Sequence, residues 1–199
     1  NNLENNYPHT HGNTIFLPKY LIDNIQNNII SNELKNTLIH EQVHVFQRKH
    51  PDIFYDLYTN YWNFKYNKLD TSIWSDLKSK SRSNPDTKNL DWIFSFNGID
   101  IVILSLFNNH SENISDVTNY GIYVDENNEF KKPFKKQILD QIPEFNSFFG
   151  SLANNNYHPN EISAEIIALH CLSNKKKISN SLINSPCYKK FKQWWNKLL

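Results

Sequence analysis

Residues 37–50 read TLIHEQVHVFQRKH, and this stretch decides the fold expected for the rest of the chain. Within it, His40, Glu41 and His44 form the pattern H-E-x-x-H. If the stretch is helical, the two histidines lie one turn apart on one face, because residues at positions i and i+4 of a helix are stacked. Two imidazole rings placed in this way can bind one zinc ion. A carboxylate beside them can take a proton from a zinc-bound water.

The residues around this pattern favour a helix that is largely buried. Asn32 and Glu33 suit its first turn, as a cap and as an acid beside the positive end of the helix dipole, and Pro51 ends it. Between these ends, apolar residues cover about half of the circumference: Leu34, Leu38, Ile39, Val43, Val45 and Phe46. The polar arc consists of His40, Glu41, His44 and Gln47. Buried polar side chains need partners, and a metal ion in a cleft would satisfy this arc.

Length and composition indicate a folded globular protein. The chain has 199 residues, of which 39% are hydrophobic and 14% are aromatic, enough for one domain with a substantial core. Its formal net charge of +1 gives no electrostatic reason to expect a nucleic acid or an anionic membrane as a partner. No segment is long and apolar enough to span a membrane. Nothing in the sequence indicates the oligomeric state.

Cysteine content and residue usage bear on the setting of the protein. Cys171 and Cys187 are too few to imply a disulfide framework, so we expect reduced thiols and an intracellular, cytoplasmic location. Asn, Lys and Ile are used heavily, as in proteins from A/T-rich genomes, including those of some large DNA viruses. This usage is a hint about source and carries no information on function.

Hydrophobic patterning along the chain predicts an α+β protein. We expect residues 1–12 to be flexible and residues 70–89, rich in Ser, Lys, Asn and Asp, to form a long loop. Alternating apolar residues predict three strands, at 91–98, 99–108 and 119–130, with a turn at Asn97-Gly98. The predicted order of elements is an extended segment at 13–18, then helices at 20–30, 32–50 and 51–69, then the sheet, then helices at 137–151, 159–172 and 186–199.

A catalytic zinc site needs three protein ligands, so a third must lie outside the two histidines. His50 follows His40 at the spacing of the metzincin pattern H-E-x-x-H-x-x-G-x-x-H. That pattern depends on a glycine that breaks the helix, and Gln47 occupies its place here. On a continuous helix, His50 would lie about 15 Å along the axis from His40. Metzincins also place a methionine below the zinc, and this chain has no Met. We therefore expect His50 to be a surface residue.

Glu161 is the alternative third ligand. It lies near the start of a predicted helix in the segment YHPNEISAEIIALH, one turn before Glu165. One of the two carboxylates can bind zinc while the other accepts the remaining N–H of a ligating histidine and so fixes its tautomer. Acids in a first helical turn can also be simple dipole partners. Two of them on an otherwise apolar helix need a buried partner, which favours the metal interpretation.

At this point the chain resembles the gluzincins, zinc metallopeptidases with H-E-x-x-H on one helix and a glutamate ligand on a later one. His40-Glu41-x-x-His44 matches the first motif in full, and 160–165, NEISAE, is similar to the family's N-E-x-x-S-D and E-x-x-A-D forms, with Glu165 in place of the usual Asp. With Gln47, the form H-E-x-x-H-x-x-Q is also similar to small, poorly characterised metallopeptidase-like proteins. The predicted sheet lies between the two motifs, which makes their spacing longer than in compact gluzincins.

The resemblance implies one zincin-like domain over residues 1–199, in which an active-site helix and a ligand helix flank a small, mainly antiparallel sheet. It implies Zn²⁺ as cofactor, with His40, His44 and Glu161 as metal ligands and Glu165 as the partner of His40. It also implies hydrolysis of peptide bonds in a peptide or protein substrate. Glu41 would act as general base towards the attacking water and then pass the proton to the leaving amine.

Two further roles have no motif to locate them. Gluzincins use a Tyr or His to stabilise the oxyanion of the intermediate. Tyr120 and His158 are our first candidates for this role, with Tyr123 and Tyr157 as others. His9 and His11 flank the segment at 13–18 and could line an edge where an extended peptide pairs with the protein.

Two other functions remain possible for the same motif. A catalytically inactive relative would keep zinc for stability and bind peptides or join a larger assembly, although the intact Glu41 argues against a purely structural site. A deformylase would take its third ligand from a cysteine upstream of the helix, and no cysteine precedes His40. A zinc metallopeptidase is the leading hypothesis.

Overall fold

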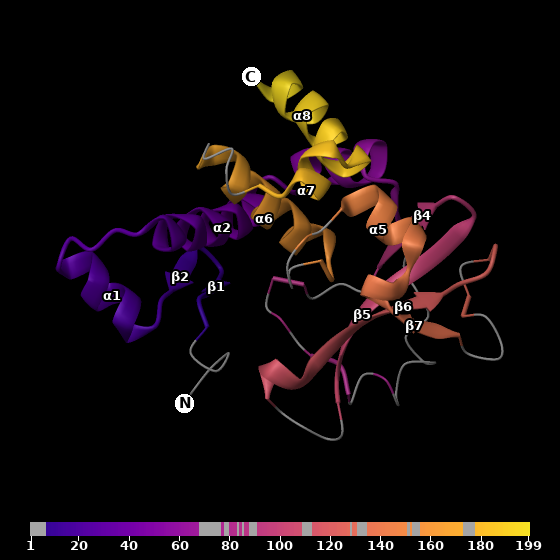
Figure 1. The fold of residues 1–199 in the computed structure, drawn as a ribbon, viewed down its shortest axis with the longest axis horizontal. Coiled ribbons are helices and arrows are strands. Elements are labelled where there is room, and N and C mark those ends of the chain that lie inside the picture. Colours follow the sequence, from indigo (N-terminus) through magenta and orange to yellow (C-terminus); the bar gives the residue numbers. More distant parts are fainter. Residues whose placement is uncertain are drawn as a thin grey trace.

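Helices and a small antiparallel sheet make up the computed structural model of the chain (Figure 1). The structure describes residues 7–67, 77, 80–82, 84, 86–87, 91–108, 113–127, 129–130, 135–150, 152, 156–172 and 178–199. Most of the loop expected at 70–89 lies outside these residues. A mixed fold with a five-stranded antiparallel sheet and a separate two-stranded one agrees with the sequence prediction of an α+β protein.

The first part of the chain is a hairpin followed by helices. Strands β1 (His9–His11) and β2 (Thr14–Phe16) pair antiparallel with each other alone. The helical segments that follow are α1 (Lys19–Gln26), α2 (Asn32–Lys49), α3 (Pro51–Asp56) and the π-helical turn η2 (Leu57–Tyr61). α2 corresponds to the helix predicted around the H-E-x-x-H pattern. Its cap is Ser31, whose hydroxyl accepts a hydrogen bond from the amide of Leu34, one residue before the expected cap.

A five-stranded antiparallel sheet follows, in the order β3-β4-β5-β6-β7. Its strands are β3 (Phe64–Tyr66), β4 (Trp92–Phe96), β5 (Ile99–Phe107), β6 (Val117–Tyr123) and β7 (Lys136–Ile138), with the 3₁₀ turn η4 (Ile114–Asp116) before β6. The three longer strands confirm the strands predicted from alternating apolar residues. Asn97 and Gly98 both have positive φ, 49° and 80°, as a two-residue hairpin turn between β4 and β5 requires.

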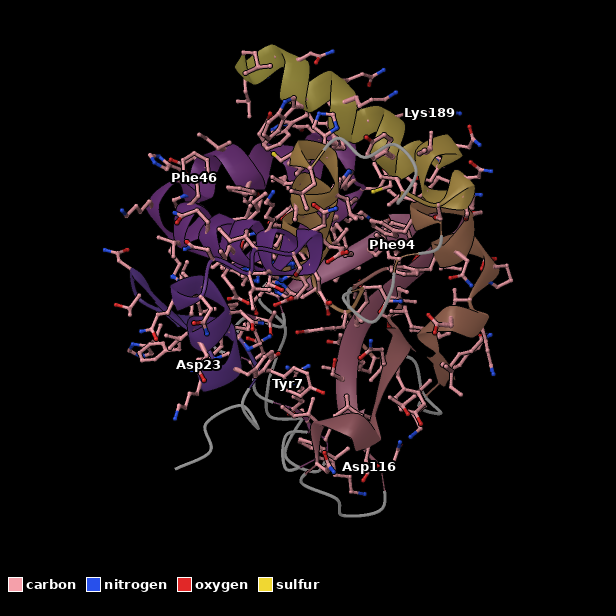
Figure 2. All side chains as sticks on the ribbon, turned by 60° about the vertical axis from the view of Figure 1, so that its left-hand side comes forward. Tyr7, Asp23, Phe46, Phe94, Asp116 and Lys189 are labelled. Atoms are coloured by element: carbon pink, nitrogen blue, oxygen red, sulfur yellow. The ribbon has the colours of Figure 1, made fainter. Side chains whose placement is uncertain are left out.

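The helical side of the sheet carries the main core. The 3₁₀ turn η5 (Leu139–Gln141) leads to α5 (Pro143–Phe149), then α6 (Pro159–Cys171), α7 (Asn180–Asn184) and α8 (Pro186–Leu198). Phe94 of β4 lies at the centre of an aromatic cluster with the phenylalanines of α5, and its ring centroid is 5.2–5.4 Å from those of Phe145, Phe148 and Phe149 (Figure 2). The opposite face of the sheet has a smaller apolar cluster that includes Val102, Leu104 and Ile122.

α2 and α6 are packed against each other in the helical layer, and this contact positions the candidate site. Both helices bury polar residues along the shared region, including His44 at 2% exposure and Glu161 at 4%. Leu34 and Val45 of α2 and Ile162 and Ala164 of α6 are buried beside them. Burial of apolar side chains therefore fixes two helices whose facing polar residues come from distant parts of the sequence.

Two expectations about helix bounds, at 51–69 and at 137–151, are wrong. Within the end expected to be flexible, residues 9–11 form β1, because they pair with Thr14–Phe16 through a turn at Gly12, which has a φ of 59°. The helix expected over 51–69 ends at Tyr61, and Asn63 has a left-handed φ of 59°. The chain then reverses and Phe64–Tyr66 becomes an edge strand.

The helix expected over 137–151 begins only at Pro143. Lys136–Ile138 pairs with β6 as an edge strand, and Ile142 has extended backbone angles. A residue before proline avoids the helical region, so Pro143 sets the start of α5.

Candidate metal centre

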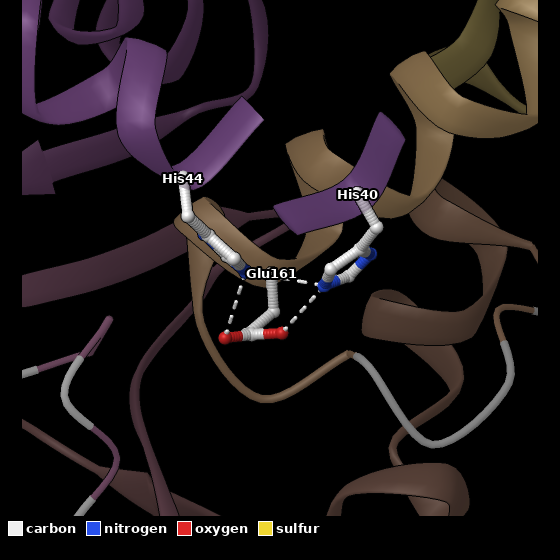
Figure 3. A group of neighbouring side chains, drawn as sticks. All are labelled: His40, His44 and Glu161. Carbon is white, nitrogen blue, oxygen red and sulfur yellow. Dashed lines mark hydrogen bonds and ion pairs between the residues drawn. The ribbon is translucent and has the colours of Figure 1, made fainter. Parts of the chain in front are cut away.

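Helix α2 presents two histidine side chains to the interior. His40 and His44 are 8% and 2% exposed, and their ring centroids are 4.8 Å apart. The i,i+4 spacing alone brings the rings together. Their Nε2 atoms lie 3.1 Å from each other and face α6 (Figure 3).

Helix α6 brings Glu161 to the two histidines. Pro159 begins this helix, and Glu161 lies in its first turn, buried at 4% exposure. One carboxylate oxygen is 3.3 Å from Nε2 of His40, and the other is 3.4 Å from Nε2 of His44. One ligand atom from each of these residues lies within 4.8 Å of the others. Among the described residues, this group is the one with metal-binding geometry.

Gln47 orients the ring of His44. The amide nitrogen of Gln47 donates to the backbone carbonyl of Asn160 at 2.8 Å, and a carbonyl can only accept. This fixes the amide so that its oxygen faces Nδ1 of His44, at 2.9 Å. Nδ1 therefore carries a hydrogen, and Nε2 of His44, which faces Glu161, is the nitrogen left to bind a metal ion or, in its absence, a proton.

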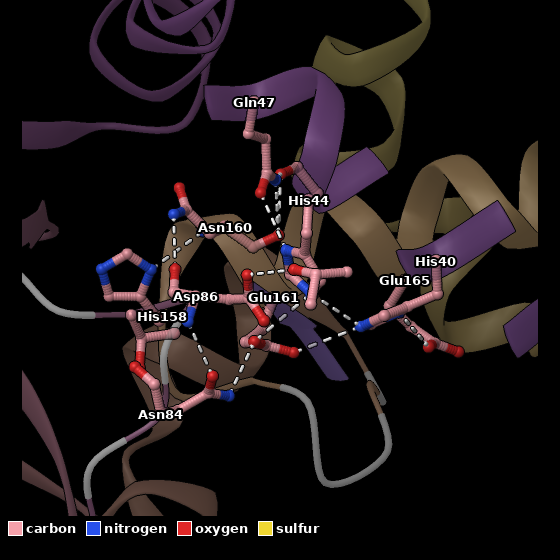
Figure 4. Close-up of polar contacts among 12 residues, drawn as sticks. His40, His44, Gln47, Asn84, Asp86, His158, Asn160, Glu161 and Glu165 are labelled. Atoms are coloured by element: carbon pink, nitrogen blue, oxygen red, sulfur yellow. Dashed lines mark hydrogen bonds and ion pairs between the residues drawn. The ribbon is translucent and has the colours of Figure 1, made fainter. Parts of the chain in front are cut away.

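Glu165 stands in the same relation to His40. Its carboxylate lies 3.5 Å from Nδ1 of His40 and about one helical turn beyond Glu161 (Figure 4). This is the contact expected from the sequence, made by the longer glutamate side chain. A carboxylate at Nδ1 leaves Nε2 of His40 as the atom that faces the centre of the group.

Two Nε2 lone pairs and a carboxylate thus converge, and they need a cation between them. Ligand atoms about 2.0–2.1 Å from one ion in tetrahedral geometry lie about 3.3 Å apart. The two Nε2 atoms, 3.1 Å apart, agree with that spacing, and each of them lies 3.3–3.4 Å from one of the two carboxylate oxygens of Glu161. The residues present therefore fit a small divalent cation.

The carboxylates and imidazoles of this group shift one another's pKa values when no metal ion is present. Burial lowers the pKa of His40, but hydrogen bonds to Glu161 and Glu165 outweigh it and raise the pKa to about 10. Burial raises the pKa of Glu161, and the two histidines reverse this effect and hold it well below its ordinary value. The site attracts positive charge strongly, whether as protons or as a metal ion.

Glu41 lies beside this group and lines the same cavity as His40, His44 and Glu161. It is 6% exposed, and its Oε2 has no hydrogen-bond partner among the described residues. Burial raises the pKa of its carboxyl group. A buried carboxyl group that lines a cavity and has an elevated pKa is suited to accept a proton from a bound molecule.

Asn84, from the loop region expected at 70–89, adds a contact to the metal-binding carboxylate. Its amide nitrogen lies 3.1 Å from Oε1 of Glu161 and 2.7 Å from the hydroxyl oxygen of Tyr157. Burial raises the pKa of Tyr157, so its phenol remains protonated. Both Asn84 and Tyr157 line the cavity of the metal-binding group.

Asp86 connects this loop region to the rest of the site. Its carboxylate accepts hydrogen bonds from the hydroxyl of Thr10, at 2.6 Å, and from the guanidinium of Arg48. Its backbone carbonyl accepts from the side-chain amide of Asn160, at 2.8 Å. Residues of β1, α2 and α6 are therefore joined around one buried carboxylate.

The cavity itself has a volume of about 750 Å³. Besides the candidate metal-binding group and Glu41, its lining includes His9 of β1, the preceding Tyr7 and Pro8, and Asn119 from β6. A cavity of this size is in the range of small-molecule and peptide side-chain sites.

Four other residues named from the sequence lie elsewhere. His50 is exposed at the end of α2, where its ring lies against that of Phe46 at a centroid distance of 4.4 Å and a tilt of 48°, so it is not a ligand. Tyr120 packs with the apolar cluster on the sheet face away from the helices. The hydroxyl of Tyr123 donates to Gln137. His158 caps α6 by accepting a hydrogen bond from the amide of Asn160 at 3.1 Å, and it lines a different cavity.

Tyr120 and His158 are therefore not brought together with the metal-binding group, although the sequence made them the first candidates for an oxyanion partner. Tyr120 lies away from the cavity because successive side chains of a strand face opposite sides of the sheet. Its neighbour Asn119 is a residue of β6 that lines the cavity. Sequence reasoning missed Asn84, Asp86 and Arg48. The turn signal Asn84-Pro85-Asp86 was present, but nothing in the sequence indicated that it would fold against Glu161.

Comparisons with protein families, curated proteins and solved structures find no match for the chain. Among the described residues, no helix is long and apolar enough to cross a membrane.

Proposed function

We propose that this protein is a zinc-dependent peptidase of gluzincin type, with His40, His44 and Glu161 as metal ligands. The observation that supports this most is the common cavity, in which a buried two-histidine, one-carboxylate group lies beside the unpartnered carboxylate of Glu41. Zinc is the ion proposed because two imidazoles and one carboxylate, with room for a further ligand, form the donor set of catalytic zinc sites. When bound, zinc supplies a Lewis acid that polarises a carbonyl group and acidifies water.

Glu41 is the proposed proton carrier. Its buried, partner-free oxygen and raised pKa suit it to take the proton of the attacking water and then deliver it to the amine that leaves. Gln47 and Glu165 would hold the two histidine tautomers in place throughout the reaction, because each accepts the hydrogen on an Nδ1 atom.

Tyr157 is the proposed donor for the oxyanion. Its hydroxyl lies in the cavity, it keeps its proton because burial raises its pKa, and the amide of Asn84 holds its oxygen. A protonated phenol fixed in this way can donate a hydrogen bond to a charge that develops on the substrate oxygen. Tyr157 is more suitable than Tyr120 or His158, since neither of these lines the cavity.

The proposed substrate is an extended peptide. Strand β1 pairs only with β2 among the described strands, so its other edge carries backbone groups that can pair with a peptide strand. Its His9 and the preceding Tyr7 and Pro8 line the cavity. A peptide paired along this edge would pass over the cavity that contains Glu41.

Zinc stoichiometry of the purified protein tests the ligand set. We expect one zinc per chain in the wild type and in His50→Ala, and loss of zinc in Glu161→Ala, because a two-ligand site binds much more weakly. Retention of zinc by Glu161→Ala, with loss in His50→Ala, would reject the gluzincin assignment.

Cleavage of a peptide library tests catalysis in the same preparations. We expect Glu41→Gln to keep its zinc and to lose at least about 10²-fold in kcat, because the amide cannot accept the proton. Wild-type protein that holds zinc but cleaves no peptide would instead support the catalytically inactive zinc-binding protein considered from the sequence.

A further inference from the structure

A second cavity, of about 330 Å³, lies next to the metal centre and is not used by the proposed reaction. Gln47 and Asn160 line it on the side towards the metal-binding group, and Asp86 borders both cavities. The metal ligands themselves do not line it. It is therefore a separate space with a lining of its own.

Four aromatic side chains form much of this lining: Tyr55, Tyr58, Tyr66 and Trp92. They come from α3, η2, β3 and β4, which the fold brings together at the end of α2. The ring of Trp92 is the common neighbour, at centroid distances of 5.8 Å from Tyr55, 5.3 Å from Tyr58 and 5.2 Å from Tyr66. The three tyrosine rings are tilted or nearly perpendicular to the ring of Trp92. The four rings therefore form a continuous aromatic wall in which the ring faces point in different directions.

Core packing accounts for Tyr58 and Trp92, which belong to the main core or pack against it, but not for the other two rings of the wall. Tyr55 and Tyr66 are 49% and 48% exposed. Half-exposed aromatic rings beside a cavity gain little from burial. They do present ring faces, which carry negative charge density and attract cations.

The charged groups around the cavity also favour a cation. Two carboxylates, those of Asp52 and Asp86, line it, and no lysine or arginine does so among the described residues. Arg48 neutralises Asp86, which leaves Asp52 as the source of net negative charge. His158 also lines the cavity, and it accepts a hydrogen bond at Nδ1, as a neutral imidazole does.

We propose that this cavity is a binding site for an alkylammonium group. The aromatic wall would hold the cation against its ring faces, and Asp52 would supply the counter-charge at the rim. The volume is at the lower end of small-molecule sites and matches one small organic cation or the end of one side chain. The site requires neither zinc nor peptidase activity, so it stands or falls separately from the proposed reaction.

Calorimetric titration with a matched pair of ligands tests the proposal. Choline and 3,3-dimethylbutan-1-ol have the same shape, but only choline is charged. We expect choline to bind about tenfold more tightly, because the alcohol fills the cavity without a cation–π interaction. Equal affinities for the two, or no saturable binding of choline, would exclude a quaternary amine as the ligand, and the same result with the lysine pair described below would overturn the proposal.

Variants at the half-exposed wall locate the binding. Tyr55→Leu and Asp52→Asn change exposed residues and should fold normally, and each should reduce the preference for choline by about threefold or more. Tyr20→Leu is the control, since Tyr20 is 61% exposed on α1 and does not line the cavity. A loss of the same size in the control would place the binding elsewhere and reject the proposed site.

A second pair identifies the source of the cation. N-acetyl-lysine methylamide and its norleucine counterpart differ in the ammonium group at the end of the side chain. Preferential binding of the lysine compound would indicate a lysine side chain of a peptide, whereas preference for choline alone would indicate a free quaternary amine. Absence of any charge preference in both pairs would contradict the proposal.

Discussion

The side-chain amide of Gln47 uses both of its ends at the metal centre. Its nitrogen donates to the carbonyl of Asn160 and to the hydroxyl of Ser163, each at 2.8 Å, and its oxygen accepts from His44. A flipped amide would place two donors against Nδ1 of His44 and an oxygen against a carbonyl oxygen. The orientation of one glutamine therefore determines which nitrogen of His44 is free to bind a metal.

We predict that Gln47→Leu lowers zinc affinity by about 10- to 100-fold, because the tautomer of His44 is no longer fixed. Competition with a chromogenic chelator measures this affinity. Gln42→Leu, an exposed change on the same helix, is the control and should leave the affinity unaltered. Circular dichroism should show an unchanged helix content in both variants. Wild-type affinity in Gln47→Leu would show that another contact orients the ring.

Of the structural elements, the hairpin of β4 and β5 was the one most fully predictable. Asn97-Gly98 is a strong two-residue turn signal between apolar runs, and both residues have the positive φ that this turn needs. A Cβ added at Gly98 would meet no atom within 4 Å. The cost of a side chain there is therefore backbone strain alone.

We predict that Gly98→Ala lowers the free energy of unfolding by about 1–2 kcal/mol, because an L-residue is strained at a φ of +80°. Urea denaturation measures the change. Gly98→Asn is the matched variant and should lose less, since asparagine tolerates the left-handed region. Equal losses in the two variants would mean that the turn relaxes to another geometry.

Predictions at the level of elements failed where a helical pattern continued past its real end. The aromatic residues after Pro51 keep helical spacing up to Phe64, and only the left-handed Asn63 interrupts the helix. The edge strand β3 then exists because it pairs with β4, which lies far along the chain. Local periodicity contains no information about such a partner, so strands of three residues were missed.

For the molecule as a whole, the candidate metal-binding group connects helices α2 and α6, which are far apart in the sequence. Two of the ligands come from α2 and the third from α6, and their side chains are buried between the helices. The sequence predicted these three residues because motif chemistry specifies them. It did not predict Asn84 and Asp86, since their contacts depend on how a loop folds over α6. Side-chain orientation on β6 was likewise not predicted, which is why Tyr120 was preferred.

We predict that a chelator lowers the melting temperature of the zinc-loaded protein by about 8–16 °C. At a free zinc concentration of about 1,000 times Kd, binding stabilises the folded state by about 4 kcal/mol, and about 2–4 °C corresponds to each kcal/mol at this chain length. Differential scanning calorimetry with and without EDTA measures the shift. Glu161→Ala should show no dependence on the chelator. The same melting temperature with and without EDTA in the wild type would reject a metal that links α2 and α6.

The separation of the ligands along the chain also sets an order of events during synthesis on the ribosome. His40 and Glu161 are 121 positions apart. At about 5–20 residues per second, roughly 6–24 s pass between the appearance of the histidine pair and that of the carboxylate. With the proposed ligand set, the nascent chain would hold an incomplete chelate during this interval. Acquisition of the ion would then be a late step of maturation, after all five strands of the sheet have been translated.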